Sequence, residues 1–275
     1  MSKIRVFLSR KSFDSANGGI SNVIMPNGAM LPFPIPSSDV KTFGDLMYAG
    51  LRYNEILPAL KYKGPMNCHI DPDLDHSRHV NAIEGWVAAF GQRGAAASYL
   101  MKTAGIKVGD VFFFFGTFHF VEKINGTYRY TKKTGDFYKD HDIQVIYGYM
   151  QVGKIITDPE EQKKYYWHPH AIAARTEDGS NVIFVAAERL SFAPDMPGAG
   201  LLPFSEHRVL TAPGCNKATW KYNDVYDVHN VIGNRKNSSK IPNTIYYSGI
   251  WQEMGLEISN ECEEWMKYII LGGAT

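Results

Sequence analysis

The amino-terminal part of the chain alternates between polar and apolar positions in a way that predicts short strands. Residues 3–8 follow the period of a half-buried strand, and a polar loop then runs to the glycine pair 18–19. Asn27 and Gly28 lie between two short apolar runs. This dipeptide favours a hairpin with a type I′ turn, because both central residues of that turn need positive φ. The prolines around it predict an irregular or edge ribbon.

The middle of the chain carries the strongest apolar runs. Four consecutive phenylalanines at 112–115 predict a fully buried strand, since a run without alternation has no solvent-facing side. Residues 144–153 form a second long strand pattern, and the polar segment 122–142 between the two predicts a long-armed hairpin. A further strand is expected at 181–187, and a polar loop at 234–243.

Helical spacing occurs in three places. Apolar residues recur at helical intervals between 43 and 60, and an alanine-rich stretch at 94–104 ends before Gly105, a residue typical of helix ends. A last helix is predicted from about Asn260, where the sequence resembles a capping box, to Leu271. The fold expected is of the α+β class: β-rich, with a β-barrel core, an amino-terminal elaboration and a carboxy-terminal helix.

Composition and charge exclude several classes of protein. The 275 residues are 44% hydrophobic, which is typical of an ordinary globular chain, and we expect one unit over 1–275. A net charge of +1 creates no global attraction to nucleic acid or an anionic membrane, so any such contact must be local. No signal-peptide pattern and no apolar run of roughly 20 residues is present, which predicts a cytoplasmic protein without a membrane partner. The three cysteines are far apart and are expected to be reduced.

The densest polar cluster of the chain spans residues 68–79. If His69, Asp71 and Asp73 lie on an extended stretch, their side chains share one face and can present an imidazole and two carboxylates to one ion. Such ligands suit Fe(II), Mn(II) or Zn(II), and the nearby histidines 76 and 79 can join or replace them. The alternative is a turn at the proline, with the aspartates capping backbone N–H groups.

A second cluster, Trp167-His168-Pro169-His170, places a tryptophan and two histidines around a proline. The histidines can supply further ligands or catalytic groups, and Trp167 can stack on a nucleic-acid base. The alternative is an aromatic anchor at the start of a strand with one buried, hydrogen-bonded histidine.

Two glycine-containing loops are candidates for binding phosphate. Ser9, Arg10, Lys11 and Asp14 follow the first strand and, with the glycine pair, can form a backbone nest with cationic side chains. The pair Gln92 and Arg93 lies between two glycines before a helix, where backbone amides can bind an anion. Each can equally be an ordinary polar loop. Neither a P-loop nor a dinucleotide-binding fingerprint is present.

Taken together, these motifs resemble known families. The spans 105–116 and 145–156 resemble the core strands of PUA-like domains of the ASCH and EVE type, which implies a PUA-like barrel core at about 90–190. More narrowly, the chain resembles the third of the nucleotide modification associated domain families, to about Trp220. The matching pieces are 7–11 with 13–15 and 18–19, the proline-rich hairpin 24–36, and 68–74, 90–96, 109–116 and 168–170. The resemblance implies association with modified bases in bacteria and phages, and implies no particular reaction.

Three functions remain open from the sequence. In the first, the protein is an enzyme that acts on a nucleotide or a base in DNA: His69, Asp71 and Asp73 bind a divalent metal, or Asp71 and Asp73 act as acid and base, and the histidines 168 and 170 complete the site. In the second, it is a non-catalytic reader that takes a modified, flipped base into an aromatic pocket. In the third, it is a scaffold for the partner enzymes of a base-modification pathway.

Overall fold

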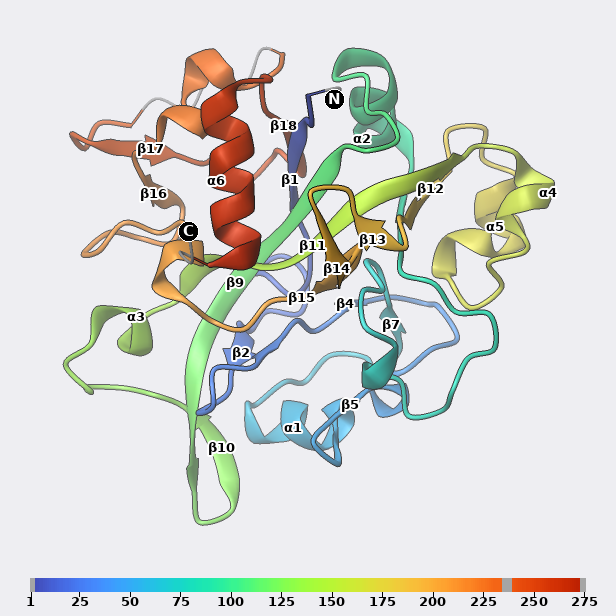
Figure 1. Cartoon of the computed structure of the whole chain (residues 1–275). Helices are drawn as coiled ribbons and strands as arrows, with labels where there is room; N and C mark the ends of the chain where they lie inside the picture. The colour runs from blue at the N-terminus through green and yellow to red at the C-terminus, as the bar shows by residue number, and fades with distance from the viewer. Residues whose placement is uncertain (1–2, 234–238, 273–275) are drawn as a thin grey trace.

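A computed structural model describes residues 3–233 and 239–272 of the chain (Figure 1). The chain is strand-rich, with 34% strand against 22% helix. The predicted polar loop at 234–243 lies partly outside the described residues, which omit 234–238.

The elements are short apart from two strands and one helix. The strands are β1 Val6–Arg10, β2 Asn22–Ile24, β3 Met30–Leu31, β4 Ile35–Pro36, β5 Met47–Tyr48, β6 Leu51–Arg52, β7 Cys68–His69, β8 Ala89–Gln92, β9 Val111–Ile124, β10 Thr127–Tyr130, β11 Ile143–Ile156, β12 Val182–Ala186, β13 Arg189–Leu190, β14 Ala193–Pro197, β15 Ala199–Leu201, β16 Thr219–Lys221, β17 Thr244–Tyr246 and β18 Glu253–Gly255. The α-helices are α1 Tyr53–Ala59, α2 Gly94–Ser98, α3 Phe137–Asp140, α4 Pro159–Gln162, α5 Ala173–Thr176 and α6 Asn260–Leu271. Single turns of 3₁₀-helix are η1 Phe43–Asp45, η2 His76–Arg78, η4 Pro169–Ala171, η5 Glu206–Arg208, η6 Asp224–Tyr226 and η7 Val228–Asn230, and η3 Tyr99–Thr103 is a π-helical turn.

A curled central sheet of half-barrel form organises the molecule. Its main path runs β18-β1-β9-β11-β12-β8. The long strands β9 and β11 pair antiparallel, which confirms the predicted long-armed hairpin, whereas β1 runs parallel to β9. The first part of β9 pairs with β1, and its next part, from Phe118, pairs with β2. Strand β9 therefore pairs first with β1 and then with β2 along its length, as the sheet curls (Figure 1).

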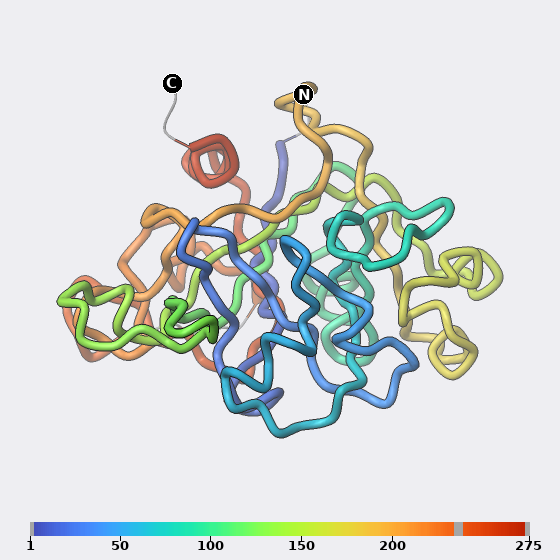
Figure 2. Tube along the Cα trace, turned by 90° about the horizontal axis from the view of Figure 1, so that it is seen from below, coloured from blue at the N-terminus to red at the C-terminus, as the bar shows by residue number. Residues whose placement is uncertain are grey.

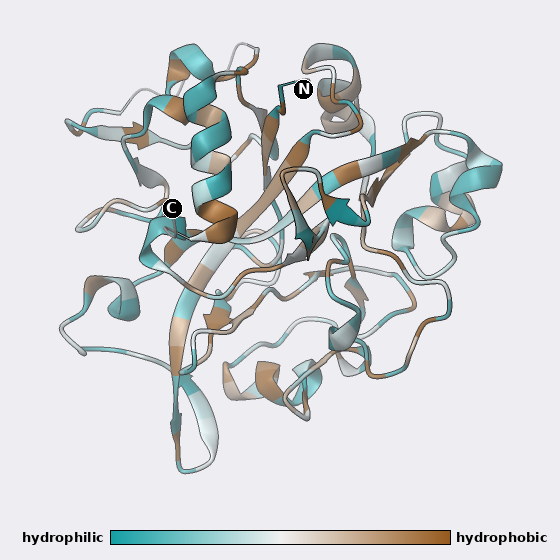
Figure 3. Cartoon of the chain, in the orientation of Figure 1, coloured by the Kyte–Doolittle hydropathy of each residue, from teal (hydrophilic) through white to brown (hydrophobic). Residues whose placement is uncertain are grey.

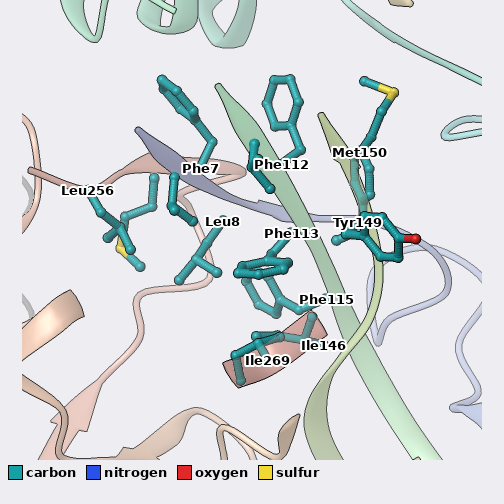
Figure 4. Packing of buried hydrophobic residues seen from close by; sticks show 14 of the residues in the cluster. Phe7, Leu8, Phe112, Phe113, Phe115, Ile146, Tyr149, Met150, Leu256 and Ile269 are labelled. Atoms are coloured by element: carbon teal, nitrogen blue, oxygen red, sulfur yellow. The ribbon is translucent and has the colours of Figure 1, made fainter. Parts of the chain in front are cut away.

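The four consecutive phenylalanines of β9 explain why the sheet is buried on both faces. All four are fully buried, and alternate residues of a strand point to opposite faces. Phe112 and Phe114 stack on each other and contact Phe90 on one face. On the other face Phe113 packs edge-on against Trp265 of α6. Figure 3 shows the first part of β9, which carries the phenylalanine run, as an apolar ribbon, and Figure 4 shows Phe113 near Ile269 of α6.

Helix α6 covers one face of this sheet. Ser259 caps its first turn by accepting a hydrogen bond from the N–H of Cys262, so the cap lies one residue before the predicted Asn260. The helix ends at Leu271, as predicted. The predicted helix at 94–104 is also present, as α2 continued by η3, with Gly105 in the left-handed conformation just after it.

The predicted helical stretch 43–60 forms an α-helix only in its last part, α1, and a single 3₁₀ turn, η1, at its start. Ala49 and Gly50 both have positive φ, and this two-residue turn joins β5 and β6 into a small hairpin. Asn27-Gly28 does join β2 to β3, but only Gly28 has positive φ, so the turn is not the type I′ turn predicted. In the stretch 43–60, the turn at Ala49-Gly50 therefore breaks the helix that the apolar spacing predicts.

The amino-terminal third of the chain builds a second core beside the sheet. Phe13, Phe33, Phe43 and Tyr53 are fully or almost fully buried in it. Figure 2 shows these blue segments, seen from below, between the green β10 region and the yellow segment around α4 and α5. No helix among the described residues is long and apolar enough to cross a membrane.

Candidate metal centre

The largest group of predicted site residues lies around one polar cavity of about 400 Å³, here called the histidine cavity. Six segments that are distant in sequence meet at its wall: the end of β1 with the loop after it, β4 with the residue after it, β7 with the residues after it, the end of β8, the segment η4–α5 and the residue before β18. Its lining residues are Arg10, Lys11, Ser12, Asp14, Asn17, Ile35, Ser37, His69, Asp71, Gln92, Arg93, His170, Arg175 and Gln252.

Asp71 is the buried carboxylate of this cavity. Its Oδ1 accepts a hydrogen bond of 2.7 Å from the N–H of Gly91, and its Oδ2 lies 3.9 Å from His69 Nε2. Burial alone would raise the pKa of Asp71, but the neighbouring His168, His170 and His69 outweigh burial and hold this pKa below its usual range. Asp71 is therefore an ionised oxygen donor.

His168 contacts Asp71 from outside the histidine cavity. Its Nδ1 accepts a hydrogen bond from the N–H of His170, which places the proton of a neutral His168 on Nε2. This Nε2 lies 3.2 Å from Asp71 Oδ1. Its N–H forms no regular hydrogen bond in this geometry, so the contact is a close approach of the buried ring to the carboxylate. His168 does not line the histidine cavity, so its contact with Asp71 positions that carboxylate.

His69 is oriented by an ion pair that the sequence did not reveal. Its Nδ1 lies 2.6 Å from Asp39 Oδ2, and Asp39 Oδ1 is 2.8 Å from Arg175 Nη1. Burial raises the pKa of Asp39, but His69 and Arg175 lower it by more, so the carboxylate stays ionised. With Nδ1 engaged, Nε2 is the ring nitrogen of His69 that is free to bind a ligand.

His170 is oriented in the same way by an amide. Its Nδ1 lies 2.6 Å from Asn181 Oδ1, and Asn181 in turn donates a hydrogen bond of 2.7 Å to Gln162 Oε1. Burial lowers the pKa of His170 to about 3, with Asp71 opposing the shift, so this imidazole is neutral near pH 7. Its ring also packs against the backbone of Gly91, where a Cβ would lie 2.2 Å from His170 Cγ.

Together His69, Asp71 and His170 form a group that can hold a metal ion, since their donor atoms lie within 4.8 Å of one another. Two imidazoles and one carboxylate suit Fe(II), Mn(II) or Zn(II). Metal-binding histidines in proteins usually engage their second nitrogen with a carboxylate or carbonyl oxygen, and both histidines here do so, through Asp39 and Asn181.

Asp73, which the sequence grouped with His69 and Asp71, lies elsewhere. Strand β7 ends at His69, and the backbone of Asp73 pairs with Ala89, the first residue of β8. Its carboxylate lies 3.0 Å from His79 Nε2 and accepts a hydrogen bond of 2.8 Å from Trp86 Nε1. The structure thus places His170 in the group in which the sequence placed Asp73.

The predicted phosphate-binding residues surround the same cavity, with one difference. Arg10, Lys11 and Asp14 line it, whereas Ser9 is buried behind it and donates a hydrogen bond of 3.0 Å to Glu253 Oε1. Lys11 Nζ is 3.2 Å from the same oxygen.

Gln92 and Arg93 also line the cavity, from the end of β8. Gln92 Nε2 donates a hydrogen bond of 2.8 Å to Glu253 Oε1, and burial raises the pKa of Glu253. Trp167 lines a neighbouring cavity and not this one.

Several residues of the site have no signal in the sequence. Asp39 and Glu253 are single acidic residues, and the hydrogen bond between Ser9 and Glu253 joins positions 244 apart. By contrast, Asn181 and Arg175 follow the cluster at 167–170 closely in the sequence, and this short separation is a signal that could have pointed to them.

Comparison with protein families gives one match: the model of nucleotide modification associated domain 3 matches residues 5–255. Comparison with curated proteins and with solved structures gave no match. The match includes every residue of the site described above. The chain therefore belongs to the nucleotide modification associated domain 3 family, which links it to the modification of nucleic acids.

Proposed function

We propose that this protein is a metal-dependent enzyme that modifies a nucleotide or a base in DNA. The observation that carries the proposal is the group His69, Asp71 and His170, placed at the wall of a polar cavity in a chain of a nucleotide modification family. A bound Fe, Mn or Zn ion supplies Lewis-acid chemistry or activates water at such a site.

Each residue of the centre has a separate task in this proposal. His69 and His170 bind the ion through their free nitrogens, and Asp71 supplies the oxygen ligand. His168 is a positioning residue for Asp71. Asp73 acts outside the cavity, because its contacts with His79 and Trp86 tie the segment after β7 to the residues before β8.

The rest of the cavity suits a nucleotide. Arg10, Lys11 and Arg93 bring cationic side chains to the wall, and phosphate oxygens are the natural partners of such groups. Asp14 accepts hydrogen bonds from the N–H groups of Ala16 and Asn17, which fixes the turn at residues 14–17 that follows Arg10 and Lys11. Gln92 is a neutral hydrogen-bonding group on the same wall.

The wider predictions also become proposals. We propose that 1–275 is a single unit whose barrel at about 90–190 is PUA-like, and that the protein works in the cytoplasm with other enzymes of base modification. The support for the barrel is that β8, β9, β11 and β12 all lie in that span and form a continuous hydrogen-bonded ladder.

The test is the metal content of protein purified without chelator, measured by plasma mass spectrometry. One equivalent of Fe, Mn or Zn is expected in the wild type and almost none in His69→Ala, Asp71→Asn or His170→Ala. His141→Ala is the matched control, because His141 is exposed next to α3 and does not line the cavity.

A wild-type protein without metal, or variants of the group that keep it, would contradict the proposal. If metal is absent while DNA carrying a modified base still binds, the reader function replaces the enzyme.

A further inference from the structure

Two more cavities adjoin the histidine cavity. The first, here called the tryptophan cavity, has a volume of about 330 Å³ and includes Trp167, Tyr166, Ile172 and Val40 in its lining. Arg93 and Arg175 line both this cavity and the histidine cavity, so a pair of cationic side chains lies where the two cavities adjoin.

The wall between these two cavities is formed in part by β7 and the residues after it. Cys68 and Ile70 line the tryptophan cavity, while His69 and Asp71 line the histidine cavity. Successive residues of an extended chain point to opposite sides, so the two cavities lie back to back across this segment.

The third cavity, here called the outer cavity, has a volume of about 260 Å³. It shares Lys41, Tyr166 and Trp167 with the tryptophan cavity. The three cavities therefore follow one another in a row. Cationic side chains lie at both junctions, and aromatic rings lie at the second.

The surface along this row carries exposed apolar and unpaired cationic groups. Tyr166 is 65% exposed, Val40 88% and Ile172 42%. Among the described residues neither Arg93 nor Lys41 is part of an ion pair, whereas Arg175 is paired with Asp39. Cations that follow a backbone, with aromatic rings on which bases stack, are how proteins bind single-stranded nucleic acid.

We infer that the three cavities form a binding track for a single strand of nucleic acid, so that the substrate is a polynucleotide and not a free mononucleotide. The target nucleotide occupies the histidine cavity, and its neighbours occupy the tryptophan and outer cavities. Phosphate groups pass Arg93 and Arg175 at the first junction and Lys41 at the second. The assignment of the target to the histidine cavity rests on the proposed function.

The test measures affinity against strand length. Thymidine monophosphate, dinucleotide and trinucleotide compete with a fluorescein-labelled oligothymidylate at low salt, and fluorescence anisotropy gives each Kd. Each added base that stacks should tighten binding on the order of tenfold. Tyr166→Leu and Lys41→Gln should each remove on the order of tenfold from the trinucleotide affinity and leave the monophosphate affinity unchanged. Tyr166 is exposed, Lys41 is half-buried and neither belongs to a core, so these variants keep the fold.

Tyr246→Leu is the control, because Tyr246 is a 48% exposed tyrosine on β17. In Figure 1 this strand lies on the side of the molecule opposite to α4 and α5. Equal affinity for the monophosphate and the trinucleotide would overturn the track, as would trinucleotide binding that Tyr166→Leu and Lys41→Gln leave intact. Metal content is read in the same samples. If the protein holds metal but its affinity does not depend on strand length, the metal enzyme is supported and the track is refuted. If affinity depends on strand length but no metal is bound, the track is supported and the metal enzyme is refuted.

Discussion

Replacing Gly91 by alanine tests how tightly the site is built. A Cβ on residue 91 would lie 2.2 Å from Cγ and 2.3 Å from Cδ2 of His170. Carbon atoms in contact need about 3.5 Å, so the His170 ring must move by about 1.3 Å. Gly91 does not have a left-handed backbone conformation, so alanine is strained only by this contact.

The displacement should lower both stability and metal affinity. Overpacking of this kind costs about 1–3 kcal/mol, which urea denaturation measures as a lower midpoint at unchanged slope. A ring moved by that distance no longer binds the same ion as His69 and Asp71, since ligand distances in metal sites hold to about 0.2 Å. We expect metal affinity to fall at least on the order of tenfold in competition with a chromophoric chelator.

Gly179→Ala is the matched control. A Cβ at Gly179 meets nothing within 4 Å, and its backbone is not left-handed. This variant should keep the stability and metal affinity of the wild type. If Gly91→Ala behaves like Gly179→Ala, the packing of His170 against β8 is not what fixes the site, and the reasoning fails.

Three further predictions follow from other contacts. Asp39→Asn removes the charge that orients His69 and should lower metal affinity on the order of tenfold to a hundredfold, measured by chelator competition; unchanged affinity would exclude this orienting role. Removing the metal with a chelator should lower Tm, since an ion at a hundred times its Kd stabilises the folded state by about 2.7 kcal/mol; scanning calorimetry that shows the same Tm with and without metal would contradict the site. Met266→Ala in α6 should cost about 2–5 kcal/mol because Met266 is fully buried, whereas Leu271→Ala, at a 44% exposed position, should cost far less in the same urea titration.

Local patterns in the sequence predicted the elements that local physics decides. The phenylalanine run of β9 and the capped helix α6 were expected and are present, because burial on both faces and capping leave marks within a few residues. The stretch 43–60 misled because its helical spacing continues across Ala49-Gly50, whose turn geometry breaks the helix.

The candidate site was predictable only in pieces. His69 and Asp71 keep the alternation expected of an extended chain and line one cavity, but β7 ends before Asp73, so the alternation no longer applies there. His170 reaches the same cavity from a segment about a hundred residues later, through packing against Gly91. Asp39 joins the site through a contact between distant segments, and such contacts leave no periodic signal.

The most direct test of the account compares the metal content of His170→Ala with that of Asp73→Asn. The structure places His170 among the donor atoms and Asp73 against His79 and Trp86. The account predicts that His170→Ala purifies without the ion and that Asp73→Asn keeps one equivalent. Metal retained in His170→Ala, or lost only in Asp73→Asn, would contradict the proposed centre.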